Sequence, residues 1–468
     1  MAGTSLWDYI FIRASIFLLH LIAPLSVAYS LVNLLARLPF QFPRVLQAWL
    51  GLEALFYLAV YLPLNKYLQR AAKHPVPPCR ADRRKLFLRC HQNIPDPAQY
   101  LRKWFRNAPV SEIKRDNVKD FFRWAFLNTG DHDSTYDEEL EEYTQEIEKL
   151  LGKKLEPGRG NAKCLRLTLE KVEMLHRSLT WYLCVFVVDT IASISLRYHS
   201  FNFHRTSFSQ FFTSFPLRLF TLFATCTSHA NSLTYWHRPH TSKTRLPILF
   251  IHGIGVGLYP YINFLADINA HDAGNSSDGQ VGIIAIEIMS VGKVCLGITF
   301  VERYGSVVAA QLLRSPEVSQ HIGPALFIDP VSFLLHLPEV AYNFICRRPS
   351  QPKEYLLSYF GSKDIGIAHT LFRRFFWADN LLWKEDIRDH PVTVVLAGRD
   401  SVIDTKAIRA YLLGSDNWIL ETTDLMDLGQ KGDRLDVIWF QDLDHGQVFD
   451  EKRTRSSLVE IVWTFCKK

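Results

Sequence analysis

The chain has 468 residues, of which 48% are hydrophobic and 21% charged, a balance that supports a folded core and excludes an intrinsically disordered protein. This length exceeds the roughly 100–200 residues of one ordinary domain, so we expect one large domain and an accessory region. The net charge of +6 is modest and the basic residues lie beside apolar segments, which argues against a nucleic-acid partner and favours a membrane surface.

Two apolar segments stand near the start of the chain. Residues 14–36, ASIFLLHLIAPLSVAYSLVNLLA, carry no charge and are long enough to cross the roughly 30 Å hydrocarbon layer as a helix. Residues 46–64, LQAWLGLEALFYLAVYLPL, follow closely, so residues 1–70 are predicted to form a transmembrane helical hairpin rather than a cleaved signal peptide. Glu53 lies inside the second segment, and the cost of an unpaired acid at membrane depth leaves an interfacial or re-entrant helix as the alternative.

Basic residues predict the orientation of this hairpin. They are denser after the second segment than in the loop between the two, where only Arg37 and Arg44 occur, so the positive-inside rule places the rest of the chain in the cytosol. The eight cysteines include no CxxC pair, which agrees with reduced thiols and argues against a zinc ribbon or a disulfide scaffold. We therefore expect a multi-pass protein of an intracellular membrane, such as the endoplasmic reticulum, in which Asn275 of the sequon Asn-Ser-Ser is not glycosylated.

Residues 71–240 are predicted to be a helical linker region. Residues 110–130 repeat apolar side chains at intervals of three and four, and residues 137–155 have an acidic start and a basic end that suit the helix dipole. The segment 179–196, LTWYLCVFVVDTIASISL, has Asp189 at its middle and a borderline length, which favours a buried or membrane-surface helix over a third span.

From residue 241 to 468 short apolar runs alternate with helical stretches, the pattern of parallel strands joined by crossovers. The predicted fold class is therefore α/β, with a mostly parallel sheet and flanking helices. Strands are predicted at 246–252, 281–288, 297–301, 324–330, 391–398 and 436–443.

Polar motifs follow three of these strands. The first strand runs into His252-Gly253-Ile254-Gly255, where glycines permit a tight backbone that can turn amide hydrogens toward a developing oxyanion. Asp400 follows a later strand and His445 follows the last one, so an acid and a histidine are both expected at strand carboxyl ends. Each motif also has a structural alternative: a tight turn, a helix N-cap at Asp400 and a loop histidine.

At these motifs, over about residues 245–465, the sequence resembles the α/β-hydrolase fold family. The segments RPHTSKTRLPILFIHGIG, FIDPVSFLLHLPEVAYNF and RRFFWADNLLWKEDI are similar to fungal membrane-anchored lipase/esterase-like members. The resemblance implies a serine nucleophile, a histidine base and an orienting acid, with no metal and no organic cofactor. Carried over by position, it assigns the base to His445 and the acid to Asp400, with Asp329 in reserve and Asp404 as a weaker third. It assigns the oxyanion hole to amides of His252, Gly253, Ile254, Gly255 and Tyr304.

The nucleophile elbow departs from the family pattern. G-x-S-x-G aligns onto Val301-Glu302-Arg303-Tyr304-Gly305, so arginine stands in place of serine. A guanidinium stays protonated at any relevant pH and cannot attack a carbonyl. Ser306, three residues later, is the alternative nucleophile, and Arg303 could instead bind a carboxylate or phosphate or be a solvated, salt-bridged arginine.

The link before the elbow is also unusual. Only about eight residues separate the predicted strands ending near 288 and beginning near 297, whereas a parallel crossover normally needs a dozen or more. One lesion, or an error in the derived sequence at 289–305, explains both departures more simply than two adaptive substitutions.

A long insertion at about 331–390 separates two predicted strands and carries several large aromatic residues. In hydrolases that act on lipids such a cap covers the site, which favours an acyl ester or lipid substrate, although a helix packed on the sheet explains the same residues. The sequence thus predicts a membrane-anchored protein of serine ester or lipid hydrolase lineage, catalytically impaired at Arg303. An active esterase that uses Ser306 and a non-catalytic membrane binding or scaffold protein are the alternatives.

Overall fold

The computed structural model describes residues 5–36, 42–207, 220–230, 233–255, 257–273, 278–287, 305–414, 427–428 and 435–467. The chain divides into two compact units, which are described separately. The first unit comprises Met1–Arg70, Lys171–Glu302 and Arg348–Thr370, and the second comprises Ala71–Glu170, Arg303–Arg347 and Leu371–Lys468.

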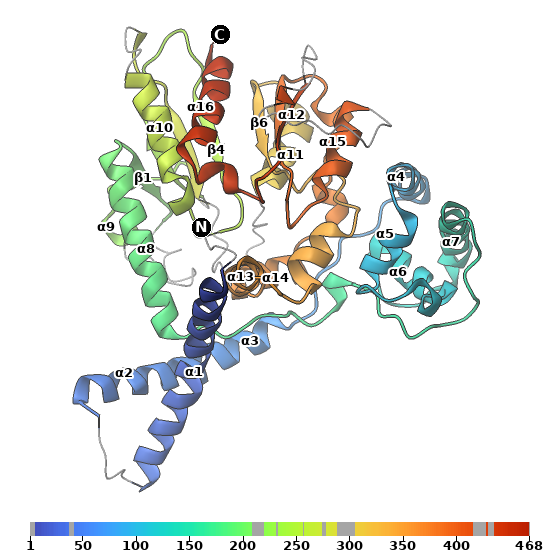
Figure 1. Ribbon diagram of the computed structural model, residues 1–468, viewed down its shortest axis with the longest axis horizontal. Helices are drawn as coiled ribbons and strands as arrows, with labels where there is room; N and C mark the ends of the chain where they lie inside the picture. Colours follow the sequence, from blue (N-terminus) through green and yellow to red (C-terminus); the bar gives the residue numbers. More distant parts are fainter. Residues whose placement is uncertain are drawn as a thin grey trace. The chain divides into compact units, whose positions relative to one another are not determined.

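Long apolar helices begin the first unit (Figure 1). These are α1 (Leu6–Ala36), α2 (Arg44–Leu55), the π-helix η1 (Phe56–Tyr61), α3 (Leu62–Leu68) and α8 (Leu179–Tyr198). By length and composition, three stretches could cross a membrane: Leu6–Ala36, Arg44–Leu68 and Leu179–Tyr198. The third stretch was expected to be a buried or surface helix, but its mean hydropathy of 1.7 also permits a span.

Glu53 has the partners that an acid in an apolar helix requires. Its side chain is fully buried, and its carboxylate accepts hydrogen bonds from the backbone amides of Leu179 (2.8 Å) and Thr180 (2.7 Å) and from the Thr180 hydroxyl (2.5 Å). These donors form the first turn of α8, where the positive end of the helix dipole favours a negative charge. The acid therefore joins α2 to α8 instead of standing unpaired among apolar residues.

A five-stranded sheet forms the centre of the first unit, in the order β2-β1-β3-β5-β4. Its strands are β1 (Asn202–Arg205), β2 (Cys226–Thr227), β3 (Thr234–Arg238), β4 (Ile248–Ile251) and β5 (Ile283–Glu287), and helices α9 (Phe220–Phe223) and α10 (Ile262–Ala273) belong to the same unit. The strand β5 pairs in parallel with β4 and antiparallel with β3.

The helical prediction for residues 71–240 missed three of these strands. The boundary predicted at residue 241 falls between β3 and β4, inside one sheet. Strands β1 (NFHR) and β3 (TYWHR) contain histidine and arginine rather than a run of aliphatic residues, so no hydrophobic pattern marked them. Their cations are accommodated by buried partners such as Asp272, which pairs with Arg238 at 2.9 Å.

A group of helices opens the second unit (Figure 1). They are α4 (Arg80–Gln92), α5 (Pro97–Trp104), α6 (Arg115–Leu127) and α7 (Asp137–Leu151), with 3₁₀ turns at Val110–Glu112, Ser134–Tyr136 and Leu167–Leu169. Helices α6 and α7 lie within the segments predicted at 110–130 and 137–155. The rings of Phe87 and Tyr143 stack with centroids 4.0 Å apart, and Arg83 pairs with the buried Glu139, so both an apolar core and ion pairs hold the group together.

The second sheet has the order β6-β7-β9-β8. Its strands are β6 (Ala325–Ile328), β7 (Val392–Ala397), β8 (Asp427–Leu428) and β9 (Leu435–Phe440), and β6, β7 and β9 pair in parallel. Every residue of β7 is buried, as expected for a strand covered on both faces. Helices α11 (Gly305–Arg314), α12 (Pro316–Ser319), α15 (Thr405–Leu413) and α16 (Lys452–Cys466) and the turn Gln447–Phe449 belong to this unit. The carboxyl ends of three parallel strands consequently meet at one edge of the sheet.

The insertion between β6 and β7 consists of short helices. These are η8 (Val340–Cys346), α13 (Pro352–Leu356), η9 (Leu357–Ser362), α14 (Ile365–Arg373) and the 3₁₀ turns Trp377–Asn380 and Lys384–Ile387. Two of the large aromatic residues in this insertion, Phe372 and Trp383, are 1% and 7% exposed. These two side chains therefore pack inside the protein, as the alternative interpretation proposed.

The predicted strand at 297–301, the short link before it, Arg303 and Tyr304 all lie outside the described residues.

Candidate active site

The carboxyl ends of β7 and β9 approach each other closely at a glycine. The amide of Gly398 donates to the carbonyl of Phe440 (2.8 Å), and a Cβ at residue 398 would lie 2.5 Å from the backbone oxygen of Gln441. Only a residue without a side chain fits there. This close approach brings the turn after β7, which carries Asp400, beside the turn after β9, which carries His445.

Asp400 and His445 form a hydrogen-bonded pair. Oδ2 of Asp400 lies 2.7 Å from Nδ1 of His445, and the Asp400 side chain is fully buried whereas 33% of the histidine side chain is exposed. The other oxygen, Oδ1, accepts from the amides of Val402 (2.7 Å) and Ile403 (2.9 Å), so the carboxylate cannot rotate freely. Because the proton of the neutral imidazole is needed on Nδ1 for this bond, Nε2 is left as the basic nitrogen. Nε2 has no hydrogen-bond partner in the described part of the chain.

Asp329, the reserve acid, has a different role. It directly follows β6, has a left-handed φ of 43° and is 5% exposed. Its Oδ1 accepts from the amide of Ala397 and its Oδ2 from the amide of Gly446, both at 2.8 Å. The side chain thus ties β6 to the end of β7 and to the residue after His445, and the acid that holds the imidazole is Asp400.

Asp404 also differs from its prediction as a third candidate acid. Its Oδ1 accepts from the amide of Ala407 (3.0 Å) and caps helix α15. The structural alternative for Asp400, that of a helix N-cap, is therefore wrong, because the cap lies four residues later.

The charges around the pair shift two pKa values. Burial lowers the pKa of His445, but the charge of Asp400, its hydrogen bond and the charges of Asp329 and Asp444 together raise it from 6.5 to about 9. Burial is the largest influence on Asp329 and raises its pKa from 3.8 to about 6. The imidazole is consequently protonated in most molecules at neutral pH, and the fraction with a free basic Nε2 grows as the pH rises.

Asp329, Asp400 and His445 also carry the kinds of atoms that bind metal ions. One ligand atom from each of Asp329, Asp400 and His445 lies within 4.8 Å of the others. All four carboxylate oxygens, however, already accept hydrogen bonds from amides or from the imidazole. A cation would have to displace these donors, so the arrangement fits an acid–histidine pair better than a metal centre.

Asp444 was not singled out from the sequence. It is 7% exposed, and its Oδ1 accepts from the amides of Ser401 and His445, both at 2.8 Å. The side chain fastens the two turns to each other and adds negative charge beside the imidazole. The one feature of the sequence that could have indicated Asp444 is its position directly before His445.

Ser306, the alternative nucleophile, is the second residue of α11 and is half-buried. Among the described residues it makes no hydrogen bond to His445.

The predicted oxyanion turn, His252 to Gly255, follows β4 in the first unit. His252 is 2% exposed, and its Nδ1 lies 2.7 Å from the carbonyl oxygen of Gly253. The ring therefore stabilises its own turn. The oxyanion role of these amides, and that of Tyr304, stays a prediction.

Comparisons with known proteins gave distant similarities. No family model matches the sequence, and no curated protein matches it. Among solved structures the chain is similar to a membrane phospholipase A described as a bacterial virulence factor, with a TM-score of 0.36 and 12% identity over 61% of this chain and 94% of that one. A putative aryl esterase from Burkholderia cenocepacia has a TM-score of 0.32 and 14% identity over 50% and 96% of the two chains. A carboxylesterase from Bacillus subtilis has a TM-score of 0.31 and 9% identity over 60% and 97%. Scores and identities this low do not establish a family or an activity.

Proposed function

We propose that this chain is a membrane-anchored protein of serine ester or lipid hydrolase lineage, with the α/β-hydrolase fold, and that Arg303 leaves it catalytically impaired. The observation that carries the proposal is the Asp400–His445 pair, 2.7 Å apart, at the carboxyl ends of the adjacent parallel strands β7 and β9. Serine hydrolases of this fold hold their acid and base after late strands, in this chain order.

The roles of the paired residues follow from their hydrogen bonds. Asp400 orients the imidazole and stabilises its charged form, so that Nε2 could take a proton from an attacking hydroxyl. At Arg303 no such hydroxyl exists, and a guanidinium neither gives up its proton nor attacks an acyl carbon. The site would then bind an ester without forming an acyl-enzyme.

Membrane attachment rests on the first two apolar stretches, Leu6–Ala36 and Arg44–Leu68, each long enough to cross a bilayer. The basic residues after the second stretch support an intracellular membrane with the acid–histidine pair on the cytosolic side. We propose an acyl ester or lipid as the ligand, because such molecules are concentrated at that surface.

A fluorophosphonate probe, which reacts with activated serines, tests the proposal on the full chain in detergent micelles. Wild-type protein should not be labelled, and Arg303→Ser should become labelled, since a hydroxyl then stands at the elbow. The label should disappear in Arg303→Ser with His445→Gln, and the control Arg303→Ala should stay unlabelled.

Two other outcomes would support the alternatives. Labelling of the wild type that Ser306→Ala abolishes would establish an active esterase and contradict the impairment. Binding of an ester analogue without turnover, in wild type and in Arg303→Ser alike, would favour the scaffold protein. Transcript sequencing across residues 289–305 decides whether Arg303 belongs to the natural chain.

A further inference from the structure

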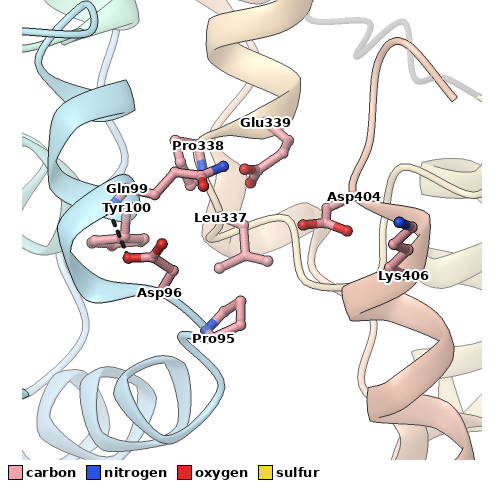
Figure 2. Close-up of a pocket in the computed structure, with 9 residues that line it drawn as sticks. All are labelled: Pro95, Asp96, Gln99, Tyr100, Leu337, Pro338, Glu339, Asp404 and Lys406. Atoms are coloured by element: carbon pink, nitrogen blue, oxygen red, sulfur yellow. Dashed lines mark hydrogen bonds between the residues drawn. The ribbon is translucent and has the colours of Figure 1, made fainter. Parts of the chain in front are cut away.

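A cavity of about 310 Å³ in the second unit has an acidic lining whose carboxylates already have partners (Figure 2). Asp96 and Asp404 cap helices α5 and α15, and Glu339 accepts from the ammonium group of Lys103 at 2.8 Å. Helix capping and an ion pair account for these three acids, so they do not identify a ligand. Side chains whose ligand atoms are both accessible and without partners lie in the first unit, on its sheet.

Two histidines share one face of the five-stranded sheet. His204 lies on β1 and His237 on the neighbouring antiparallel strand β3, two residues after Tyr235, the register partner of His204. Residues two positions apart along a strand point to the same face. Both imidazoles therefore project from the face opposite to that of the buried Phe203 and Trp236. The two imidazole centroids are 5.5 Å apart, and the ring planes meet at 73°.

The ring nitrogens of this pair are accessible. Nδ1 of His204 lies 3.4 Å from the carbonyl oxygen of Thr227, and neither ring makes another hydrogen bond within the described residues. None of the remaining three nitrogens is a buried atom, so each keeps contact with solvent. Ile284, the register partner of His237 on β5, is 38% exposed. A ligand from solution can therefore reach both imidazoles.

The separation of the rings fits a shared metal ion. Zinc binds an imidazole nitrogen at about 2.0–2.1 Å, which puts each ring centre roughly 3 Å from the ion and two tetrahedrally arranged ring centres about 5 Å apart. The observed 5.5 Å is close to this value, so small side-chain rotations complete the geometry.

His204 is also oriented as metal-binding histidines usually are. Its ring stacks on Tyr235 with centroids 4.6 Å apart, and the Thr227 carbonyl faces Nδ1. A backbone carbonyl at one ring nitrogen favours the proton there, which leaves the lone pair on Nε2 for a metal. Burial and the charge of His204 lower the pKa of His237 below 6.5, so this ring is neutral at physiological pH, as a metal ligand must be.

The ligand type selects the metal. Imidazole nitrogen suits zinc, copper and nickel, whereas calcium and magnesium require oxygen ligands. We propose that His204 and His237 together bind one zinc ion, with water in the remaining positions. Cys226 is the register partner of His204 on β2, but its sulfur and the two rings do not form a group whose ligand atoms all lie within 4.8 Å, so the thiol is not part of the site. Neither histidine belongs to the Asp400–His445 pair, so the proposal does not depend on the hydrolase lineage.

The test is isothermal titration calorimetry with zinc chloride on the full chain in detergent micelles. Because the chain has 17 histidines and 8 cysteines, the site is identified by comparing variants. His204→Gln and His237→Gln should each weaken one saturable binding event at least about tenfold, since a single imidazole then replaces a chelating pair. His321→Gln, which removes an exposed histidine of the second unit, and Cys226→Ser should bind as the wild type does.

Thermal unfolding separates binding from folding. Without zinc, both histidine variants should unfold at the wild-type midpoint, because their side chains lie on an accessible face. Zinc should raise the wild-type midpoint, as any ligand of the folded state does, and should raise it less in either variant. Wild-type zinc affinity in His204→Gln or in His237→Gln would overturn the proposal. A loss in Cys226→Ser as large as in the histidine variants would assign the zinc to the thiol and would overturn it as well. None of these results depends on esterase activity.

Discussion

The Asp400–His445 pair can be tested without any substrate by substituting Asp400 with asparagine. In Asp400→Asn the side-chain oxygen can still accept from the amides of Val402 and Ile403, so the turn should persist. The negative charge 2.7 Å from Nδ1 of His445 is lost. Burial, which lowers the pKa of the ring, is then opposed only by the charges of Asp329 and Asp444.

The size of the effect follows from the shift of the histidine pKa from 6.5 to about 9. At 1.36 kcal/mol for each pKa unit this shift corresponds to about 3 kcal/mol. Since a third of the side chain is exposed, solvent screening reduces the contribution to about 2 kcal/mol. A raised histidine pKa stabilises the folded state fully below pH 6.5, and this stability is lost as the pH rises through 9.

The assay is histidine ring NMR on the full chain in micelles, over pH 5 to 10. The chain has 17 histidines, so the His445 signals are identified as those missing from His445→Gln. In wild type the ring should titrate well above 6.5, and in Asp400→Asn the midpoint should fall back toward 6.5 or below. Asp329→Asn is the control, because the oxygens of Asp329 bind amides rather than the ring, and it should change the midpoint less.

Two results would refute this reasoning. One is a wild-type ring that titrates at or below 6.5, which would mean that the pair is not charge-assisted. The other is an equal shift in Asp400→Asn and Asp329→Asn, which would show that no single acid holds the imidazole.

Three further predictions concern stability and orientation. Glu53→Ala removes the acceptor of three hydrogen bonds at the start of α8 and should destabilise the fold by about 3 kcal/mol, which lowers the thermal unfolding midpoint. Glu53→Gln should lower the midpoint less, and a midpoint of Glu53→Ala equal to that of the wild type would contradict the pairing. Gly398→Ala forces a Cβ to within 2.5 Å of the backbone oxygen of Gln441 and should lower the free energy of unfolding by about 1–3 kcal/mol, seen as a lower thermal unfolding midpoint. Gly255→Ala is the control, because the space around residue 255 is open, and its midpoint should be close to that of the wild type. Mass spectrometry of the peptide containing Asn275 should find no glycan, and a glycan there would reverse the proposed membrane orientation.

Some elements were predictable because their signal is local. Strands β4, β5, β6 and β7 each lie inside a segment predicted from a continuous apolar run, and β9 overlaps the segment predicted at 436–443. The apolar helices were predicted from length and lack of charge. Strand β1 was not, because its sequence NFHR has no aliphatic pattern. It pairs with β3 more than thirty residues later along the chain, and such a contact leaves no mark in a short window.

The sequence by itself determined which residue types follow the strands: an acid after β7, a histidine after β9 and an arginine at residue 303. Only the tertiary structure decided which of Asp329, Asp400 and Asp404 holds the imidazole, because the three carboxylates have the same chemistry and differ only in the donors that the fold places beside them. Strand register and the close approach at Gly398 place the Asp400 oxygen 2.7 Å from the ring. Glu53 repeats the point, since its partners at the start of α8 are more than 120 residues away in sequence. Apolar patterning is a property of neighbouring residues, whereas the partner of a buried charge is set by the packing of distant segments.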